Sequence, residues 1–295
     1  MGTLGRVILL QGLVKRQADS AATAAPADER FDLRVSWPLL FVHASVVSVF
    51  FTGWSPVALA VAGGLFVARA FGLTAGYHRY FAHRSFRTSR AFQFALAWLG
   101  ASAAQLGPLW WASHHRLHHL HSDTEHDVHS PRRGLWWAHM GWLLCRRYSA
   151  TDLAAIQDFA RFPELRFLDR CPWPPPLTLV LALFALGGLP FVAWGFCVST
   201  VVLYHVTFAV NSLGHRFGGQ RYESGDASRN NLWIALATLG DGWHNNHHRF
   251  PRAARHGYGR RELDLTWLGL RGLAALGLVW DLRPPPAGAL VAPPR

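Results

Sequence analysis

Long apolar stretches without charged residues dominate the hydropathy pattern of this 295-residue chain. Three stretches stand out: residues 37–51, 56–68 and 172–213. A helix needs about 20 residues to cross the hydrocarbon core of a bilayer. The last stretch, 42 residues long, therefore has the length of two spans. A turn between them is expected at residues 187–190 (GGLP), where glycine and proline cluster.

The first two stretches meet at residues 53–56 (GWSP), which predict a second tight turn. The segment after Pro56 reaches span length only by including Arg69 and continuing to Tyr77. The expected fold class is an all-α integral membrane protein with four transmembrane helices in two hairpins. The predicted spans are residues 36–53, 56–77, 172–190 and 193–213.

Charged residues are concentrated outside these hairpins, and neither hairpin tip contains Lys or Arg. Positively charged segments tend to stay on the cytoplasmic side of a membrane. We therefore expect both termini and a helical cap, residues 78–170 and 214–283, to be cytoplasmic, which in a bacterium means the inner membrane. The membrane domain is predicted over 34–283, between a disordered tail at 1–33 and a Pro-rich tail at 284–295.

Residues 91–111 are apolar enough to be mistaken for a fifth span. A fifth span would place the histidines before and after it on opposite faces of the membrane. The segment also contains Gln93, Gln105 and Pro108, and three arginines precede it. These features predict a helix that lies in or under the membrane interface.

The net charge of +12 comes almost entirely from arginine, because Lys15 is the only lysine. No groove-reading motif accompanies this charge, so nucleic acid is not an expected partner. Anionic lipid headgroups, an acidic electron donor or a phosphate-bearing substrate explain the charge better. The three cysteines, Cys145, Cys171 and Cys197, form no CxxC pair and are expected to be reduced thiols.

Histidines form three clusters in the predicted cap: residues 78–83 (HRYFAH), 115–119 (HRLHH) and 244–248 (HNNHH). Positions i, i+3 and i+4 share one face of a helix, so the last two clusters each present three imidazoles together. His78 and His83 lie about 140° apart on a regular helix, so they are expected where a helix ends or distorts. With His215 the clusters offer nine imidazoles, more than one metal ion accepts, and imidazole suits zinc, copper, iron and nickel alike.

Several motifs closely resemble those of the membrane-bound fatty acyl desaturases of the stearoyl-CoA type, in the bacterial form without a fused cytochrome b5 domain. The resemblance extends from about residue 36 to residue 283, with all motifs in order and at the spacing of the family. The motifs are GLTAGYHRYFAHRSF at 72–86, HRLHH at 115–119, SPRRG at 130–134, GWLL at 141–144, NSLGH at 211–215 and GWHNNHHRFP at 242–251.

This resemblance implies a di-iron centre, with two Fe ions and O2 as co-substrate. The implied histidine ligands are His78, His83, His115, His118, His119, His215, His244, His247 and His248. The family's asparagine, which approaches one metal through water, corresponds to Asn211.

Metal-bound imidazoles usually need an acceptor for their second ring N–H. The acidic residues close to the ligands in sequence are Asp123, Glu125, Asp127, Asp241 and Glu223, each of which can equally be a solvated or helix-capping group. Eight histidines remain: His43, His114, His121, His126, His129, His139, His205 and His256. His43 and His205 lie in predicted spans and are expected to be structural, with partners inside the protein. One or two of the others are expected to support the ligands.

The reaction implied by the resemblance is oxidative: O2 is activated, two hydrogens leave adjacent methylenes, and a cis double bond and water form. The chain has no G-x-G-x-x-G fingerprint, no haem-attachment motif and no CxxC iron–sulfur pattern. Electrons are therefore expected from an external ferredoxin-like, rubredoxin-like or cytochrome b5-like donor with its reductase. The basic cytoplasmic face suits an acidic donor.

The implied substrate is a long saturated acyl chain, desaturated at the delta-9 position in a narrow apolar tunnel. The positions that line this tunnel in the family correspond to Gln105, Trp111, Thr207 and Phe208. Arg146 and Arg147 correspond to a basic pair that contacts the phosphates of coenzyme A, although such residues can also be interface anchors.

The acyl carrier is left open by one departure from the family. The animal acyl-CoA enzymes have an Arg-Asp pair where this chain has Ser113 and His114. Acyl-CoA is still the expected carrier, and acyl carrier protein and phospholipid are the alternatives.

Two other functions are open at this point. A histidine-rich di-iron hydroxylase of lipids shares the metal chemistry but inserts oxygen, and its products differ in mass. A metal transporter needs ligands near the bilayer midplane, whereas here every cluster is expected at one membrane face.

Overall fold

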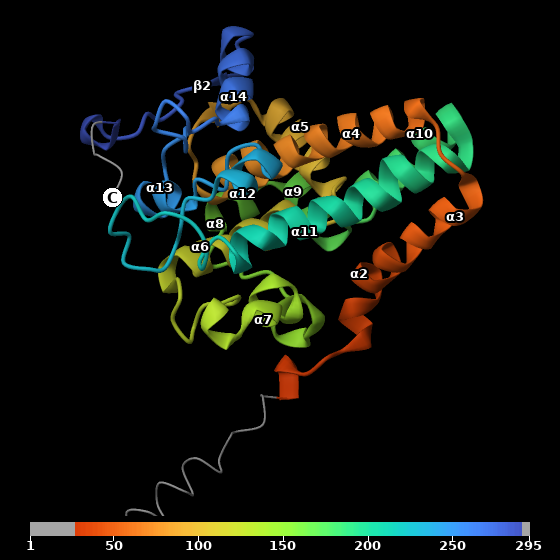
Figure 1. The fold of residues 1–295 in the computed structure, drawn as a ribbon, viewed down its shortest axis with the longest axis horizontal. Helices are drawn as coiled ribbons and strands as arrows, with labels where there is room; N and C mark the ends of the chain where they lie inside the picture. The colour runs from red at the N-terminus through yellow and green to blue at the C-terminus, as the bar shows by residue number, and fades with distance from the viewer. Residues whose placement is uncertain (1–26, 291–295) are drawn as a thin grey trace, which may run out of the picture.

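The computed structural model describes residues 27–290, and this part of the chain is mostly helical, as predicted (Figure 1). Three of the described helices are long and apolar enough to cross a membrane. They are Leu33–Thr52, Pro56–Ala82 and Pro174–Ser212. In Figure 1 they extend toward the right of the view, and the histidine-bearing cap gathers at the left.

The first two apolar helices are separated by the turn predicted at residues 53–56. The first consists of α2 (Leu33–Ser45), η2 (Val46–Ser48) and α3 (Val49–Thr52), and the second of α4 (Pro56–Phe71) and the π-helical η3 (Gly72–Ala82). Gly53 has a φ of +68°, a conformation that favours glycine. The hydroxyl of Ser55 accepts the N–H of Ala58 at 3.1 Å, and Pro56 occupies the first turn of α4, as is typical of helix starts.

The third apolar helix contains a backbone break at the other predicted turn. It comprises α10 (Pro174–Phe191), the π-helical η7 (Val192–Val198) and α11 (Ser199–Ser212). Gly187 and Gly188 have non-helical dihedral angles, with a φ of +64° at Gly188. The indole N–H of Trp194 donates to the carbonyl of Gly53 at 2.8 Å, so this break lies next to the turn between α3 and α4.

The single helix predicted over residues 91–111 is wrong. The segment forms two short helices, α5 (Arg90–Ala101) and α6 (Pro108–His121). In the segment between these two helices, Ala104 and Leu106 have positive φ values, which interrupt the helix. Pro108 also disfavours helical geometry in the residue before it. Continuous hydrophobicity concealed this break. Neither helix approaches the length of about 20 residues that a span requires.

The cap consists of short elements connected by loops. They are η1 (Ala27–Glu29), β1 (Arg87–Thr88), η4 (Pro131–Arg133), α7 (Leu135–His139), η5 (Gly141–Leu144), η6 (Arg146–Tyr148), α8 (Gln157–Ala160), α9 (Pro163–Arg170), α12 (Leu232–Ala237), α13 (His244–Arg249), α14 (Leu265–Ala275), β2 (Val279–Trp280) and η8 (Ala287–Leu290). Strands β1 and β2 are antiparallel, with Arg87 opposite Trp280. Helices α6 and α13 lie at the left of Figure 1, away from the hairpin tips.

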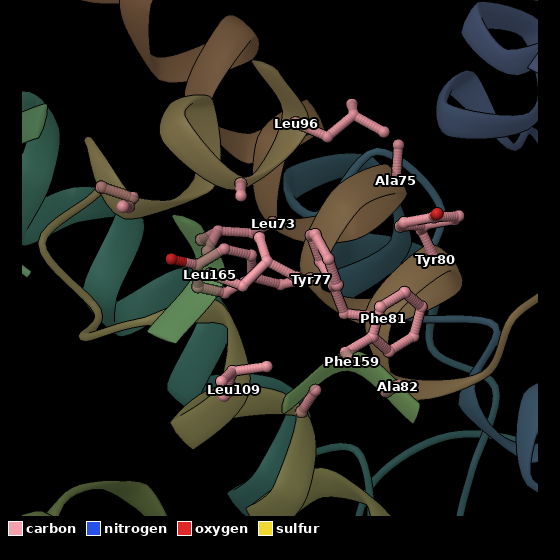
Figure 2. Close-up of a cluster of buried hydrophobic side chains, with 14 of the residues drawn as sticks. Leu73, Ala75, Tyr77, Tyr80, Phe81, Ala82, Leu96, Leu109, Phe159 and Leu165 are labelled. Carbon is pink, nitrogen blue, oxygen red and sulfur yellow. The ribbon is translucent and has the colours of Figure 1, made fainter. Parts of the chain in front are cut away.

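The main hydrophobic core surrounds η3 and fixes the position of the first histidine cluster. Figure 2 shows Tyr77 and Phe81 of η3 among Leu96 of α5, Leu109 of α6 and Phe159 of α8. Tyr77 and Phe81 are fully buried, and burying such an aromatic side chain contributes about 1.5–3 kcal/mol. These contacts hold η3 against α5 and α6 beside the second cluster.

Both predicted tails have contacts with the cap where the structure describes them. Glu29 is paired with Arg133 at 2.6 Å and accepts the hydroxyl of Tyr148 at 3.0 Å. At the other end, Ala289 is buried, and its carbonyl accepts the hydroxyl of Tyr222. The assignments of residues 1–26 and 291–295 as tails lie outside the described residues.

Candidate metal centre

The first histidine cluster lies where a helix distorts, as its spacing predicts. His78 belongs to the π-helix η3, and His83 follows its last residue. The N–H of His83 donates to the carbonyl of His78 at 3.2 Å, which is the i to i+5 bond of a π-helix. Residues five apart are therefore adjacent along the helix axis, and the two imidazole rings lie 5.0 Å apart.

The other ligand candidates come from three further elements. Helix α6 carries the second cluster and α13 carries the third, each with an i, i+3, i+4 pattern on one face. His215 follows the end of α11.

A tight turn comes just before α13, where the backbone carbonyl of Gly240 accepts the N–H of Trp243 at 3.2 Å. A Cβ at Gly242 would lie 2.1 Å from the backbone nitrogen of Ala235, so glycine is required where this segment approaches α12.

The structure gathers the nine predicted histidines into two groups, within each of which the ligand atoms lie within 4.8 Å of one another. The five-histidine group contains His78, His83, His115, His119 and His247. The four-histidine group contains His118, His215, His244 and His248. His115 and His119 are partly buried and the other seven are buried. Helices α6 and α13 contribute to both groups, so the two groups are adjacent.

The Nε2 atoms point toward one another within each group. In the five-histidine group, the Nε2 atom of His247 lies 2.9 Å from those of His78 and His119. In the four-histidine group, the Nε2 atoms of His215 and His244 are 2.9 Å apart. Convergence of ring nitrogens at this distance is the geometry that ligands of one cation adopt.

Carboxylates fix the orientation of four of these imidazoles by accepting the N–H at Nδ1. The pairs are His78 with Asp241 at 2.7 Å, His118 with Asp127 at 2.9 Å, His215 with Asp123 at 3.0 Å and His248 with Asp226 at 2.5 Å. A proton held at Nδ1 leaves the lone pair on Nε2, which is the tautomer that binds metal. Asp123, Asp127 and Asp241 are confirmed as acceptors among the acidic residues considered above.

Glu125 and Glu223 are exposed instead, and the partner of His248 is Asp226, which the sequence reasoning missed. Asp226 lies 22 residues before His248, in a loop, so no helical spacing connects the two. Its carboxylate also accepts the hydroxyls of Ser224 and Ser228. The sequence offered one signal for this acceptor: Asp226 lies three residues after Glu223 and has a serine two residues away on each side.

Two buried ring nitrogen atoms in the four-histidine group show whether its residues fit a metal ion. Nε2 of His118 and Nε2 of His248 have no hydrogen-bond partner in the described structure. A buried polar atom without a partner costs about 1–3 kcal/mol. Because each ring donates from Nδ1 to a carboxylate, each Nε2 offers a free lone pair into the four-histidine group. A bound cation would satisfy both atoms, so the residues fit a metal ion.

Burial favours the neutral form of seven of the candidate ligands. It lowers the pKa of His83, His115, His118, His244, His247 and His248 well below the usual value of histidine, and neighbouring imidazoles lower it further. Burial also lowers the pKa of His119 to about 3. Neutral rings at pH 7 are what metal ligation requires.

Two of the remaining histidines lie beside the groups. His256 is fully buried, with Nδ1 3.3 Å from Asp241, and its ring lies 4.5 Å from that of His247. His129 contacts the ring of His118 at 4.2 Å. His43 and His205 have partners inside the protein, as predicted, because their Nε2 atoms lie 3.3 Å apart and His205 also contacts His139.

An apolar cavity of about 170 Å³ lies beside the five-histidine group. The predicted tunnel residues Gln105, Trp111, Thr207 and Phe208 all line it, and so does Asn211. His115 of the five-histidine group reaches its wall. The amide of Gln105 donates to the hydroxyl of Thr207 at 3.1 Å, which closes one side. Four apolar residues of α2 also line the cavity: Val35, Pro38, Leu39 and Val42.

The two arginines predicted to bind substrate phosphates lie outside this cavity. Arg147 is paired with Glu29 at 3.5 Å and with Asp28 at 3.8 Å, which offsets its charge. Arg146 is exposed beside the start of α2, in a surface depression that Asp28 and Asp32 also line. This pairing with the N-terminal segment was not visible in the sequence.

The fold and the site together define a class: helical membrane proteins in which histidine groups able to hold metal lie beside an apolar cavity. Residues 52–263 match the model of the fatty acid desaturase family. The chain belongs to this family and is an oxidoreductase.

Similar proteins of known activity act on acyl groups with different carriers. The sn-1 stearoyl-lipid 9-desaturase of Anabaena variabilis is 41% identical over 78% of this chain and 85% of its own length. The protein of the same name from Synechocystis is 38% identical over 90% of this chain and 86% of its own length. The icosanoyl-CoA 5-desaturase of Limnanthes douglasii is 35% identical over 86% of this chain and 73% of its own length.

Proposed function

We propose that the protein is an O2-dependent desaturase that inserts a cis double bond, at the delta-9 position, into a long saturated acyl chain. The observation that carries this proposal is that His115 of the five-histidine group lies in the wall of an apolar cavity, with the four-histidine group adjacent to it. The similar proteins from Anabaena variabilis and Synechocystis are lipid 9-desaturases, which supports the delta-9 position.

The nine histidines are proposed to hold two iron ions, with Asn211 approaching one of them through water. Asn211 belongs to α11 and lines the cavity beside the histidines. Bound iron would supply the activation of O2 that removal of hydrogen from an unactivated methylene requires. Imidazole alone does not select iron, so this choice rests on the reaction of the family.

The residues of the chain supply positioning and the exclusion of water. The walls from α2 and α11 hold the acyl chain in extended contact, and Trp111, stacked on His115 at 5.0 Å between ring centres, bounds the cavity beside the histidines. In each turnover a saturated chain, O2, two electrons and two protons give an alkene and two water molecules. The electrons come from an external ferredoxin-like, rubredoxin-like or cytochrome b5-like donor with its reductase.

We propose that the acyl chain is linked to a membrane lipid during the reaction, and not to coenzyme A. Three observations support this carrier. The positive charge of Arg147 is offset by the carboxylates of Asp28 and Glu29. Ser113 and His114 are buried, so neither replaces the Arg-Asp pair at the surface. Val35, in the first turn of α2, lines the cavity, so the cavity reaches the level where a candidate span begins.

A carrier assay separates these alternatives. The full chain in nanodiscs, with a reducing system, is given either stearoyl-CoA or a distearoyl glycerolipid, and products are located by mass spectrometry. We expect the double bond in the lipid. Product on coenzyme A alone, with a raised Michaelis constant after replacing Arg146 and Arg147 with Gln, would restore the acyl-CoA assignment.

The proposed function is tested by expression in a desaturase-deficient host, followed by fatty-acid profiling with double-bond location. We expect monounsaturated chains from the wild type and none from His119→Ala. His121→Ala is the matched control, because His121 lies on the same helix but outside both groups. Hydroxylated chains of higher mass, or full activity of His119→Ala, would contradict the proposal.

A further inference from the structure

A basic groove of about 590 Å³ lies on the cap, and it shares no lining residue with the acyl cavity. Strands β1 and β2, helix α8 and the start of α5 contribute to its walls. Six exposed arginines line it: Arg84, Arg87, Arg90, Arg161, Arg252 and Arg283. Only two carboxylates line the same groove, those of Asp158 and Asp281.

Internal ion pairs leave much of this positive charge unbalanced. Arg84 is paired with Asp158 at 3.2 Å, Arg87 with Asp281 at 3.3 Å, and Arg90 with Glu164 at 2.7 Å. Among residues 27–290, Arg161, Arg252 and Arg283 form no ion pair. The groove therefore presents a positive field to a partner, and such a field attracts acidic proteins and speeds their association.

The floor of the groove is aromatic, with Tyr80, Phe86, Phe159, Phe162 and Trp280. The guanidinium of Arg161 lies 4.9 Å from the ring of Phe162, and that of Arg84 lies 5.4 Å from the ring of Phe159. Arginine and large aromatic residues are the types enriched where proteins bind proteins. A lipid headgroup site needs the charge but not a concave aromatic floor.

The groove lies close to the five-histidine group, both along the chain and through side-chain contacts. Arg84, on its wall, directly follows His83 in the chain. The Arg116 side chain, which follows His115, donates to Asp158 of the groove at 2.9 Å and to the carbonyl of Ala82 at 2.9 Å. Phe159, on the floor, packs against Phe81 of η3 at 5.0 Å between ring centres.

We propose that this groove is the docking site of an acidic electron-transfer protein, and that electrons enter on the His83 side of the five-histidine group. The proposal rests on the proposed function, which requires two electrons per turnover. Two reduced one-electron carriers dock in succession, and each leaves oxidised. Their two electrons, with two protons, O2 and the two hydrogens of the acyl chain, are accounted for in two water molecules.

The test compares two sources of electrons for the same iron-loaded full chain in nanodiscs of uncharged lipid. One source is a reduced acidic plant-type [2Fe–2S] ferredoxin, and the other is dithionite, a small chemical reductant. The groove variant is Arg161→Glu/Arg252→Glu/Arg283→Glu. The matched control is Arg260→Glu/Arg261→Glu/Arg271→Glu, which changes the net charge equally at exposed arginines outside the groove.

We expect the groove variant to show a Michaelis constant for ferredoxin raised on the order of tenfold or more, with a weaker dependence on salt. Its dithionite-driven turnover should equal that of the wild type, which shows that the variant is folded. The control should behave as wild type with both electron sources.

A groove variant with unchanged ferredoxin kinetics would overturn the docking proposal. Unchanged ferredoxin kinetics combined with weaker binding to vesicles of anionic lipid would assign the groove to lipid headgroups instead. Absence of a double bond in the wild type with either electron source would contradict the proposed function and not the groove.

Discussion

Among single residues, four of the nine candidate ligands are oriented by a carboxylate that accepts the N–H of their second ring nitrogen. Four histidines donate from Nδ1 to a buried or nearly buried aspartate. Although burial alone raises the pKa of Asp226, its hydrogen bond from His248 lowers that pKa well below the usual range. Asp226 is therefore ionised, and it holds the proton on Nδ1 and the lone pair on Nε2 of His248.

Asp226→Asn tests this orientation. The amide is nearly the same size but offers no negative charge to His248, so metal affinity at the four-histidine group should fall by about 10–100-fold. Competition with a chelator, followed by counting the metal that stays bound, measures the loss. Glu125→Gln is the control, because Glu125 is exposed near the same group. Equal metal retention in both variants would show that Asp226 has no part in ligand orientation.

At the scale of elements, the N-terminal segment is attached to the cap by Glu29. Burial raises the pKa of this carboxyl, but hydrogen bonds from Arg133 and Tyr148 outweigh it, so the pKa lies below the usual 4.5. A carboxyl whose pKa is lowered on folding contributes stability above its unfolded pKa and loses it as the pH falls through its folded pKa. The contact of η1 with the cap should therefore weaken below about pH 4.5.

Hydrogen exchange at residues 27–33 measures this attachment. We expect faster exchange, after correction for intrinsic rates, when the pH falls from 5.5 to 3.5. Glu29→Gln should exchange fast at both pH values, whereas Asp28→Asn, at a carboxyl 3.8 Å from Arg147, should resemble the wild type. A wild type whose exchange does not change with pH would remove Glu29 as the anchor.

The close packing of η3 on α5 sets the position of the first histidine pair. A Cβ at Gly100 would lie 2.4 Å from the ring of Tyr77, which is fully buried and donates its hydroxyl to Leu106 at 2.9 Å. Gly100→Ala should therefore lower the free energy of unfolding by about 1–3 kcal/mol and reduce iron content.

Thermal unfolding and metal analysis check this expectation. Gly272→Ala on α14 is the matched control, because its new methyl group meets open space and alanine favours a helix by up to about 1 kcal/mol. Identical unfolding temperatures for the two variants would mean that the contact between Gly100 and Tyr77 does not limit the packing of η3.

The sequence predicted elements and residues wherever the signal is local. Five-residue spacing predicted the distortion at His78 and His83, and glycine with proline predicted the turns at 53–56 and 187–190. The sequence could not predict contacts between residues that lie far apart along the chain. Glu29 meets Arg133, and Asp226 meets His248, only because the fold places their loops together.

At the scale of the whole molecule, we propose four spans in two hairpins with the cap on the cytoplasmic side. The break at Gly187 and Gly188 and its contact with Gly53 support this topology. Reporters fused after Arg90 and after His129 should both report cytoplasm, because α5 and α6 are each too short to cross a bilayer. Opposite signals at these two positions would require an odd number of crossings between them.

Nine histidines of one chain are expected to build two adjacent metal sites, and the number of irons bound per chain reports this directly. Anaerobic reconstitution of the full chain, with bound iron measured per chain, should give two irons for the wild type and for His121→Ala. His247→Ala, in the five-histidine group, and His244→Ala, in the four-histidine group, should each lose about one iron. A wild type that binds a single iron, or variants that both retain two, would rule out two sites built from these nine histidines.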